Sequence, residues 1–503
     1  MTSDAVSALP FVDRPWPGLD VAGLTVLVAG FGISGYAVAD QTLQRGAAVI
    51  AVDESDDEQT TQRARILEVL GADIRLGPGC SRQLPADRDI DLVVTSPGWR
   101  EDHPLLAAAA AAGIPVISEI ELARRMQAPD GPAWLAVTGT NGKTTAVTML
   151  ESILQAAGLR AVACGNVGLP VVEAALDPTG FDVLAVELSS FQLHWTQHVQ
   201  AESAAVLNVA QDHLDWHGGL DAYIAAKGRI YEQVRTACVY TVTEPRTREL
   251  VEQADVVEGA RAIGIGLGAP GLSELGIVDG LLVDRAFHED RHHSAVALAS
   301  LDDLAHLGPH GAPPHLVLDA LAAAALARSY GVEPDAVREG LRAYRPGHHR
   351  AEIVAVHDDI AFVDDSKATN PESARASLTA ADSIVWITGG LTKDADVDQL
   401  VASVTARLRG VVLIGADPAP FARALERHAP EVPVVRPEPG TLESTEDRRR
   451  YLDEVVAAAR DLAHPGDVVL LAPAAASMDQ FVNYAQRGDL FAAAARALEG
   501  GTT

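Results

Sequence analysis

Residues 134–145 read Trp-Leu-Ala-Val-Thr-Gly-Thr-Asn-Gly-Lys-Thr-Thr. An apolar run ends in a glycine-containing turn and then enters a helical pattern, so the stretch predicts a strand, a loop and the start of a helix. Such a loop holds phosphates because its backbone N–H groups turn inward and the helix start adds a positive dipole end. We expect Lys143 to reach the terminal phosphates of a nucleotide and Thr144 to offer its hydroxyl to Mg²⁺. The loop departs from the common form of this motif, because Val137 stands where the first glycine is usual.

On either side of this loop, short β-branched runs again lead into Ala-rich helical patterns, which indicates α/β architecture. A length of 503 residues favours about three domains. Turn residues near 130 and 346 suggest the boundaries, which gives the domains 1–130, 131–346 and 347–503. Residues 240–310 are less regular, and we assign them to the far edge of the central domain. We expect all three domains to contain parallel sheets with helices.

The charge balance excludes some partners. The chain has 39 basic and 69 acidic residues and a formal net charge of -30, which disfavours nucleic acid and anionic membranes. No apolar run is long enough to span a bilayer, and the first residues do not read as a secretory signal. Three widely spaced cysteines suit a reducing compartment. We therefore expect a cytoplasmic protein, and a monomer, whose partners are small molecules.

Lysine is rare in this chain, with only four among the 39 basic residues: Lys143, Lys227, Lys367 and Lys393. Where nearly all basic residues of a protein are arginine, the few lysines are expected at positions that need a compact ammonium or a modifiable amine. The alternative is that the base composition of the gene drifted and that these four lysines remained by chance. All four lysines, however, lie inside the motifs described here, which favours a functional reason.

A second glycine-rich turn follows the first predicted strand. Gly30, Gly32 and Gly35 have the spacing of a dinucleotide fingerprint, and Asp53 ends the next strand. The turn offers a helix amino terminus to a diphosphate, whether of NAD or of another nucleotide. A tight turn without any ligand is the structural alternative. This motif is weak by itself.

Candidate metal and catalytic residues follow the strands of the central domain. Glu187 ends one apolar strand, and a buried carboxylate next to a phosphate loop needs a neutralising cation, which we expect to be Mg²⁺. Another strand ends in 208–215, which contains Asp212, His213 and Asp215, and Lys227 comes soon after. Each of these taken alone is more often an ordinary loop residue than a ligand. Ligands of open parallel sheets bind at the carboxyl ends of the strands, which favours the functional interpretation.

Three loops of the last domain also follow predicted strands. Residues 364–370 read Asp-Asp-Ser-Lys-Ala-Thr-Asn, residues 389–393 read Gly-Gly-Leu-Thr-Lys, and residues 472–481 are rich in small residues and include Ser477. The small residues let a carboxylate substrate approach the backbone. A capped turn from strand to helix is the alternative for each loop.

These motifs together resemble the Mur ligase family over about residues 25–488. The residues that carry the resemblance appear in the family's order: 139–145, Glu187, Asn208 with His213, Lys227, His349-Arg350 and 365–367. The segments 96–98, 165–168, 187–193, 365–370 and 477–481 are most similar to the D-glutamate-adding branch of the family. The resemblance implies a Rossmann-like N-terminal domain that binds UDP, a central P-loop ATPase-like domain and a Rossmann-like C-terminal domain. It implies ATP-dependent amide-bond formation between UDP-N-acetylmuramoyl-L-alanine and D-glutamate through an acyl phosphate, in peptidoglycan precursor synthesis.

The resemblance also implies a role for individual residues. Lys143, His213 and Lys227 would be catalytic, and Lys227 would be carbamylated. Thr144, Glu187, His213 and Lys227 would hold Mg²⁺. ATP would be bound by Gly139, Thr140, Asn141, Gly142, Lys143, Thr144, Thr145, Arg350, Asp365 and Lys367. The UDP sugar would be bound by Gly32, Ile33, Asp53, Ser96, Gly98 and Asn166, and D-glutamate by Thr369, Lys393, Ser477 and Tyr484.

The chain departs from the family pattern where the adenine contacts are expected. The Gly-x-His-Asn-x-x-Asn segment reads here Gly308-Pro-His-Gly311, then a Pro-rich insertion, then Asp319. We hypothesise that Asp319 accepts a hydrogen bond from the adenine amino group, so Asp319→Ala should raise the KM for ATP, and an unchanged KM would refute the idea. Two alternative functions stay open: a family ligase for another amino acid, and a nucleotide-binding protein that uses NAD in its first turn.

Overall fold

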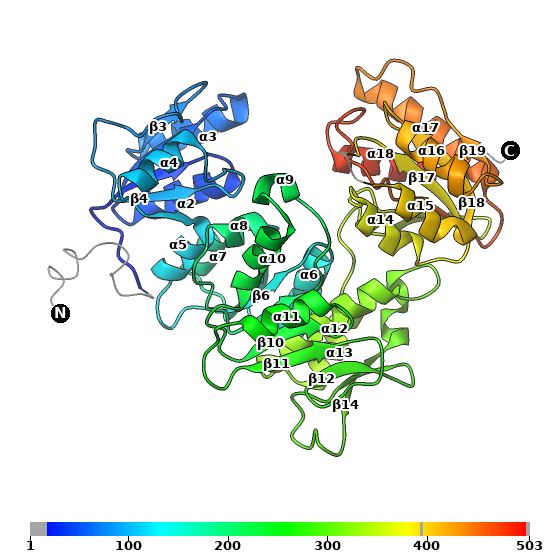
Figure 1. The fold of residues 1–503 in the computed structure, drawn as a ribbon, viewed down its shortest axis with the longest axis horizontal. Helices are drawn as coiled ribbons and strands as arrows, with labels where there is room; N and C mark the ends of the chain where they lie inside the picture. The colour runs from blue at the N-terminus through cyan, green and yellow to red at the C-terminus, as the bar shows by residue number, and fades with distance from the viewer. Residues whose placement is uncertain (1–17, 393–395, 499–503) are drawn as a thin grey trace. The chain divides into compact units, whose positions relative to one another are not determined.

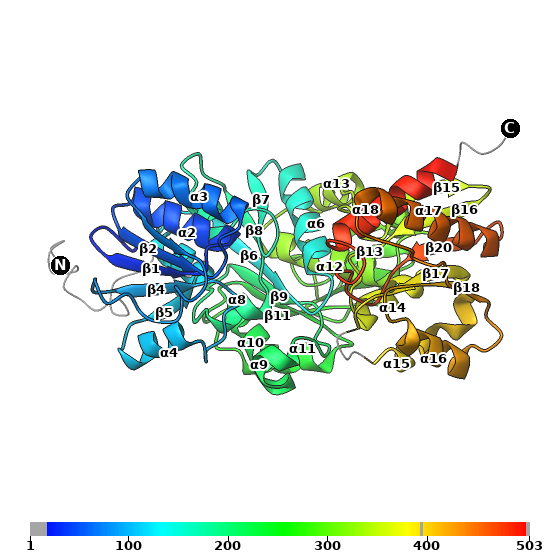
Figure 2. The same cartoon turned by 90° about the horizontal axis from the view of Figure 1, so that it is seen from above.

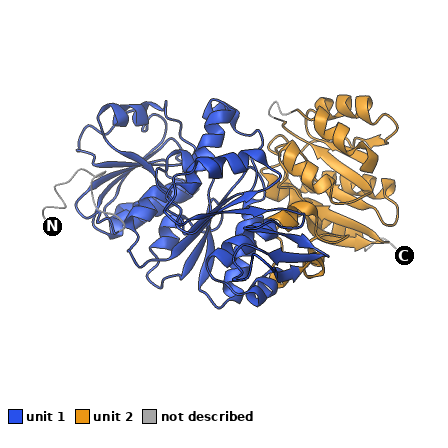
Figure 3. Ribbon diagram, turned by 60° about the horizontal axis from the view of Figure 1, so that its bottom comes forward, with its two compact units in different colours: residues 1–299, 319–341 blue, residues 300–318, 342–503 orange. Residues whose placement is uncertain are grey.

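The computed structural model of the protein describes residues 18–392 and 396–498. Lys393 therefore lies outside the described residues. The chain divides into two compact units, shown in blue and orange in Figure 3. Unit 1 comprises residues 1–299 and 319–341, and unit 2 comprises residues 300–318 and 342–503. Each unit is described by itself.

Unit 1 begins with a five-stranded parallel sheet in the order β3-β2-β1-β4-β5 (Figure 1). Its elements are β1 (Thr25–Ala29), α2 (Ile33–Gln44), β2 (Ala48–Asp53), α3 (Glu58–Val69), β3 (Asp73–Leu76), β4 (Leu92–Thr95), α4 (Pro104–Ala111), β5 (Val116–Ser118) and α5 (Glu119–Met126).

Successive side chains of β1 explain why helices cover both faces of this sheet. Val26 and Val28 share a hydrophobic cluster with Val38 of α2. Leu27 and Ala29 point the other way and share a second cluster with α4. A strand buried on both faces is expected to be apolar, which is the pattern of residues 26–29. The Rossmann-like arrangement therefore follows from this strand and the two helical patterns after it.

The second sheet of unit 1 has nine strands in the order β14-β13-β12-β11-β10-β9-β6-β8-β7. The pairs from β7 through β12 are parallel, and β12 pairs antiparallel with β13. The strands are β6 (Ala133–Thr138), β7 (Ala161–Gly165), β8 (Val183–Glu187), β9 (Ser203–Val206), β10 (Ala237–Thr241), β11 (Arg261–Ile265), β12 (Glu274–Val278), β13 (Leu281–Asp284) and β14 (Val296–Ser300).

The helical elements between residues 143 and 343 lie between and after these strands, and they begin with α6, which starts at Lys143 directly after the phosphate loop. They are α6 (Lys143–Ala156), α7 (Val171–Ala175), α8 (Ser190–His194), α9 (Leu214–His217), α10 (Leu220–Gly228), the 3-10 turn η2 (Arg229–Tyr231), α11 (Pro245–Gln253), η3 (Leu301–Leu307), α12 (Pro314–Ser329) and α13 (Pro334–Ala343). Of these elements, η3 and the first residues of α12 group with unit 2. Figure 2 shows α6 beside the strands β6, β7 and β8.

The prediction that residues 240–310 form the far edge of the central domain is confirmed for the strands β11 to β14 and wrong for residues 301–310. Strands β11 to β14 form the far edge of the central sheet, as expected. The segment is more regular than its composition indicated, because β12 and β13 form a hairpin across a turn with Asp279 and Gly280 at positive φ. Residues 300–318 group with unit 2 instead of the central domain.

Unit 2 contains a six-stranded sheet in the order β15-β16-β20-β17-β18-β19, parallel except for the β15–β16 pair. Its elements are β15 (Glu352–His357), β16 (Ile360–Asp364), α14 (Pro371–Leu378), β17 (Ile384–Gly389), α15 (Asp398–Val404), η4 (Thr405–Arg407), β18 (Leu408–Ile414), α16 (Ala419–His428), β19 (Val434–Val435), α17 (Thr445–Leu462), β20 (Val468–Leu471) and α18 (Tyr484–Ala497). Because β16, β20 and β17 are neighbours, the loops after them emerge at one edge.

Helix α5 connects the first sheet of unit 1 to the second and is buried at every position. Glu121 forms an ion pair with Arg125 one turn later at 2.8 Å, and its second oxygen accepts from the backbone N–H groups of Gln197 and His198. Such satisfied charges let a polar helix lie in an interior. Across residues 18–392 and 396–498, we find no helix with the length and apolar character needed to cross a bilayer.

Candidate active site at the carboxyl edge of the central sheet

The phosphate loop of unit 1 runs from Gly139 to the start of α6, as the sequence predicts. Gly142 caps the helix with φ of +83°, and a Cβ there would lie 2.4 Å from Asp319 Oδ1. The position therefore demands glycine for two reasons, the backbone conformation and the adjacent carboxylate. Asp319, which is buried, lies against this loop.

Asn208 supports the loop from the end of the neighbouring strand. Its Oδ1 accepts from the backbone N–H groups of Thr140 at 3.1 Å and Asn141 at 2.9 Å, and its Nδ2 donates to the carbonyl of Asn141 at 3.1 Å. The Thr140 hydroxyl also lies 2.9 Å from the phenol oxygen of Tyr223. One amide side chain therefore holds the two central peptides of the loop in place.

Two lysines converge on the first residue of this loop. Lys143 Nζ donates to the carbonyls of Gly139 at 3.0 Å and Thr140 at 2.8 Å. Lys227 Nζ, from the end of α10, donates to the same Gly139 carbonyl at 2.7 Å. Lys227 is 1% exposed, and burial, together with the charge of Lys143, lowers its pKa well below the ordinary value. Its amine is therefore inclined to the neutral, nucleophilic form.

Glu187 ends β8 beside the loop and is 1% exposed. Its Oε2 accepts from the Thr144 hydroxyl at 2.7 Å, and its Oε1 accepts from Asn166 Nδ2 at 2.8 Å. Both donors are neutral, so hydrogen bonds hold a buried carboxylate next to a phosphate loop. This environment fits Mg²⁺, which prefers oxygen ligands and would balance the charge.

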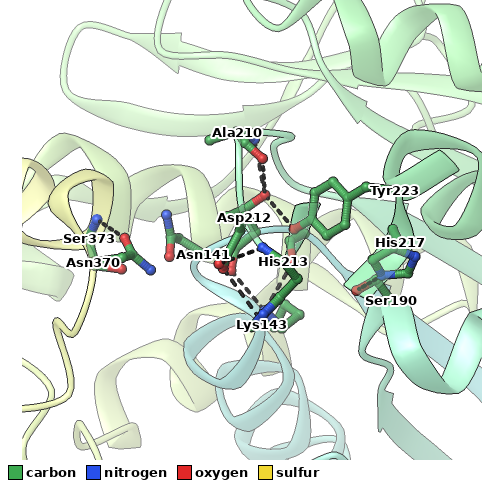
Figure 4. Close-up of polar contacts among 12 residues, drawn as sticks. Asn141, Lys143, Ser190, Ala210, Asp212, His213, His217, Tyr223, Asn370 and Ser373 are labelled. Atoms are coloured by element: carbon green, nitrogen blue, oxygen red, sulfur yellow. Dashed lines mark hydrogen bonds and ion pairs between the residues drawn. The ribbon is translucent and has the colours of Figure 1, made fainter. Parts of the chain in front are cut away.

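His213 lies at the amino end of α9 with φ of +51°. Its Nε2 is 3.5 Å from Asp212 Oδ2 (Figure 4). Its ring lies 4.7 Å from the ring of Phe191. Partial burial lowers the pKa of His213, which favours the neutral imidazole that ligates metals. Within the described ranges, no group of three or more His, Cys, Asp or Glu side chains forms a ready metal cage. A Mg²⁺ held here would complete its shell with water, substrate oxygens or a modified lysine.

A separate pocket opens in the first domain, lined by Asp53, Glu54, Gly98, Trp99, Arg100, Asp102, His103 and Pro104. Asp53 Oδ2 accepts from the N–H of Phe31 at 2.5 Å, within the glycine turn that precedes α2. Helix α2 begins after Gly32 without a side-chain cap, and Ile33 in its first turn is 65% exposed. The turn is tight, because a Cβ at Gly35 would lie 1.9 Å from the carbonyl oxygen of Gly30. Uncapped N–H groups at a helix start suit a diphosphate.

Five of the six residues predicted for the UDP sugar gather around that turn: Gly32, Ile33, Asp53, Ser96 and Gly98. Ser96 contributes by donating from its hydroxyl to the carbonyl of Gly30 at 3.2 Å. Asn166 differs, since it follows β7 of the central sheet and its side chain contacts Glu187.

In unit 2, the loop after β16 contains three of the seven residues predicted there, Asp365, Lys367 and Thr369. Asp365 accepts from Ser377 Oγ at 2.5 Å, and burial raises its pKa to about 6 while the charge of Arg350 opposes the shift. Lys367 Nζ lies 3.9 Å from the ring centroid of Tyr484, at the start of α18. The N–H of Thr369 donates to the carbonyl of Lys367 at 2.8 Å. Ser477, 3% exposed, belongs to the loop after β20.

Arg487 holds these loops together, and sequence reasoning missed it. Its Nε donates to Ser366 Oγ at 2.9 Å and its Nη2 to the Ser366 carbonyl at 2.8 Å. Ser366 Oγ in turn donates to the carbonyl of Tyr484 at 2.7 Å. Arg487 is 1% exposed, and burial lowers its pKa to about 10. Nothing local in residues 484–497 distinguishes this arginine from surface ones, because its partner lies 121 positions away.

Comparison with known protein families matches three segments of the chain. The Mur ligase MurD-like N-terminal domain matches residues 24–118, the Mur ligase middle domain residues 137–275, and the Mur ligase glutamate ligase domain residues 349–475. A curated relative from Streptomyces avermitilis, named UDP-N-acetylmuramoylalanine--D-glutamate ligase, is 55% identical over 95% of this chain and 98% of its own length. The chain belongs to the Mur ligase family.

Other relatives of this Mur ligase bear the same name. The protein of Thermobifida fusca is 52% identical over 96% of this chain and all of its own length, and that of Mycolicibacterium smegmatis is 46% identical over 95% and 97%. Among solved structures, the UDP-N-acetylmuramate-alanine ligase of Thermotoga maritima aligns with a TM-score of 0.52 at 19% identity, covering 95% of this chain and 98% of that one. A pseudomurein peptide ligase type C from Methanothermus fervidus aligns at 0.54 and 15%, covering 95% and 100%. These two structures confirm the fold of the Mur ligase.

Proposed function

We infer that this Mur ligase is an ATP-dependent amide-bond ligase that joins D-glutamate to UDP-N-acetylmuramoyl-L-alanine in peptidoglycan precursor synthesis. Curated relatives at 46–55% identity, each matched over 94–96% of this chain, all bear the name of that activity. The observation that carries the inference within the molecule is the phosphate loop with Lys143, Lys227 and Glu187 gathered on it.

We propose that the loop holds ATP and Mg²⁺. Residues 139–145 would bind the phosphates, since their N–H groups begin a helix and the Lys143 ammonium lies on this loop, at the carbonyls of Gly139 and Thr140. Thr144 and Glu187 would hold one Mg²⁺, and His213 and Lys227 a second. Bound Mg²⁺ would neutralise the charge that develops on the transferred phosphoryl group. Arg350, Asp365 and Lys367 would add contacts to the nucleotide, as the family resemblance implies.

Carbamylation of Lys227 is part of this proposal. A neutral amine attacks CO₂, forms an N–C bond and loses a proton, which turns a cation into a carboxylate-like group. Burial and the charge of Lys143 supply the neutral amine by lowering the pKa of Lys227. The modification would also remove a repulsion between two lysines that share one carbonyl.

The other two substrates are assigned by position and resemblance. The uridine diphosphate sugar would bind at Gly32, Ile33, Asp53, Ser96 and Gly98, where uncapped N–H groups of α2 meet the pocket. Asn166, whose side chain donates to Glu187, would contact the same substrate from the central sheet. Thr369, Ser477 and Tyr484 would hold D-glutamate, together with Lys393.

The chemistry requires that an unreactive carboxylate be activated. The carboxylate oxygen of UDP-N-acetylmuramoyl-L-alanine attacks the terminal phosphorus of ATP, which forms an acyl phosphate and releases ADP. The amine of D-glutamate then attacks the acyl carbon through a tetrahedral intermediate, and phosphate leaves as the amide forms. Lys143 would stabilise the phosphoryl oxygens, and His213 would orient the amine or accept its proton.

The proposal includes a cytoplasmic location and a monomeric state. The excess of acidic residues and the three free cysteines support the first. All three substrates are small molecules, so their binding requires no second subunit, which supports the monomeric state.

The deciding experiment measures ADP release from ATP and Mg²⁺ with UDP-N-acetylmuramoyl-L-alanine and either D- or L-glutamate. We expect release that needs the sugar nucleotide and D-glutamate together and is far slower with L-glutamate. A panel of other amino acids tests the neighbouring activities of the family. A preference for any of them over D-glutamate would overturn the proposal.

A further inference from the structure

Four consecutive residues of the first domain are joined to the central domain within unit 1. Trp216 Nε1 donates to the carbonyl of Gly98 at 3.2 Å, and Trp195 Nε1 donates to the carbonyl of Trp99 at 3.1 Å. In the same segment, Arg100 Nη1 donates to the carbonyl of Asp215 at 2.9 Å. The fourth contact joins Glu101 Oε1 to His194 Nε2 at 2.8 Å. We call residues 98–101 the docking loop.

The docking loop also lines the pocket assigned to the sugar nucleotide. Gly98, Trp99 and Arg100 are three of that pocket's lining residues. Two indole N–H groups from the central domain therefore hold the backbone of a substrate-binding loop. A ligand that orders this loop would also order its hydrogen bonds to Trp216 and Trp195.

The hydrogen bonds of Trp216 and Asp215 connect the docking loop to α9, which carries His213 at its amino end. The helix has four residues, none of them buried, and no side-chain cap. His213 and Gly218, which flank it, both have left-handed backbone conformations. A helix of one turn is not stable by itself, because ordering its backbone costs more free energy than its hydrogen bonding provides. Its position therefore depends on tertiary contacts.

His217 and Trp216 both supply such contacts, and of these two residues Trp216 is the one that also donates to the docking loop. Its ring lies 4.8 Å from Phe191 and 5.0 Å from His194, measured between centroids. Phe191 in turn lies 4.7 Å from His213 and belongs to the segment that follows Glu187. The indole of Trp216 thus connects the docking loop, α9 and the ring against which His213 packs.

We propose that Trp216 is a positioning residue that couples the sugar-nucleotide pocket to His213 and hence to the ATP site. This proposal rests on the proposed function, which places the sugar nucleotide at the docking loop and His213 at the second Mg²⁺. Each ligand stabilises one end of the same connection, so each increases the affinity of the protein for the other.

The test uses the full chain and titration calorimetry. The Kd of the non-hydrolysable analogue AMPPNP with Mg²⁺ is measured with and without saturating UDP-N-acetylmuramoyl-L-alanine. The Kd without the sugar nucleotide divided by the Kd with it reports the coupling. Trp216→Phe keeps an aromatic ring and removes the N–H. We expect the wild-type ratio to exceed one and the variant's ratio to fall toward one by about two- to tenfold, the value of one hydrogen bond.

Trp134→Phe is the matched control. It removes an indole N–H that donates to Gln127 Oε1 at 2.7 Å, away from the docking loop. We expect its ratio to equal that of the wild type. A merely structural role for Trp216 would weaken both Kd values equally and leave the ratio unchanged. Trp195→Phe, which removes the adjacent bond to the loop, carries the same expectation and serves if Trp216→Phe does not fold.

The coupling is overturned if the wild-type ratio is one, or if folded Trp216→Phe keeps the wild-type ratio; where Trp216→Phe does not fold, an unchanged ratio in Trp195→Phe overturns it. Steady-state ADP release by the wild type separates this failure from that of the proposed function. Normal D-glutamate-dependent release with an unaltered ratio refutes only the coupling. Absence of that release refutes the proposed function and the coupling with it.

Discussion

Lys227 Nζ lies 2.7 Å from the carbonyl oxygen of Gly139, so a buried amine from the end of α10 contacts the first residue of the phosphate loop. Lys143 Nζ contacts the same oxygen at 3.0 Å. Two ammonium groups on one carbonyl repel each other, and this repulsion helps lower the pKa of Lys227. The first prediction follows from that pair.

Replacing Lys227 with alanine should reduce ligase activity roughly 100-fold or more, because a charge-stabilising group in the site is lost. Acetate or formate should restore part of the activity by occupying the space of the carbamate. Lys227→Arg is the control, since it keeps a cation but has no amine to carbamylate, and should be inactive without rescue. Steady-state ADP release with added acids measures both. Full activity of Lys227→Ala without any acid would contradict carbamylation.

Replacing Lys143 with alanine should abolish D-glutamate-dependent ADP release, a loss of roughly 1000-fold or more, because Lys143 is the one basic residue of the proposed phosphate-binding segment 139–145. Thr148→Ala changes the same helix one turn later, where the Thr148 hydroxyl donates to the carbonyl of Thr144 at 2.7 Å. This control should retain activity within a few fold of the wild type. Near-wild-type release by Lys143→Ala would refute the assignment of the phosphate loop.

Gly142 precedes α6 and Gly158 follows it, and their φ angles are nearly equal, +83° and +80°. Alanine at either site costs about 1–2 kcal/mol of backbone strain. Only at Gly142 does the added Cβ also meet a neighbour, Asp319 Oδ1, at 2.4 Å; at Gly158 it meets nothing within 4 Å. We expect both variants to lose stability, Gly142→Ala the more, and only Gly142→Ala to raise the KM for ATP, by about tenfold or more. Equal KM values would show that Asp319 does not constrain the loop.

Glu119 at the start of α5 predicts a pH dependence of stability. It is 2% exposed, its Oε1 accepts from the N–H of Val172, and its Oε2 has no hydrogen-bond partner among residues 18–392 and 396–498. Burial raises its pKa from 4.5 to about 7. Between these values the folded state binds more protons than the unfolded state, so the free energy of unfolding falls as pH rises, by up to about 3 kcal/mol.

Glu119→Gln should remove this dependence, because the amide does not ionise. Melting temperatures measured from pH 4.5 to 8 should therefore change less in the variant than in the wild type. Glu68→Gln, which removes an exposed charge from α3, should keep the wild-type slope. A slope in Glu119→Gln as steep as in the wild type would assign the dependence to other groups.

Much of the fold could be predicted from local patterns. Strands β1, β6, β8 and β20 and helix α6 lie where the sequence predicts them, because continuous apolar runs and helical periodicity are read over a few residues. Strands β11 to β14 were harder to predict. Their runs are interrupted by Gly264 and Gly276, where a Cβ would strike neighbouring side chains or backbone, so only their pairing explains them as strands.

The sequence by itself determined the phosphate loop, the α/β class, the family and most of the candidate residues, because each depends on residue types close together in the chain. Tertiary structure decided how distant residues meet. It alone places Lys227 on Gly139, Asp319 against Gly142, Asn166 on Glu187 and Arg487 on Ser366. The physical reason is that these contacts join separate elements, whose distances and burial depend on how the whole sheet packs and not on any local pattern.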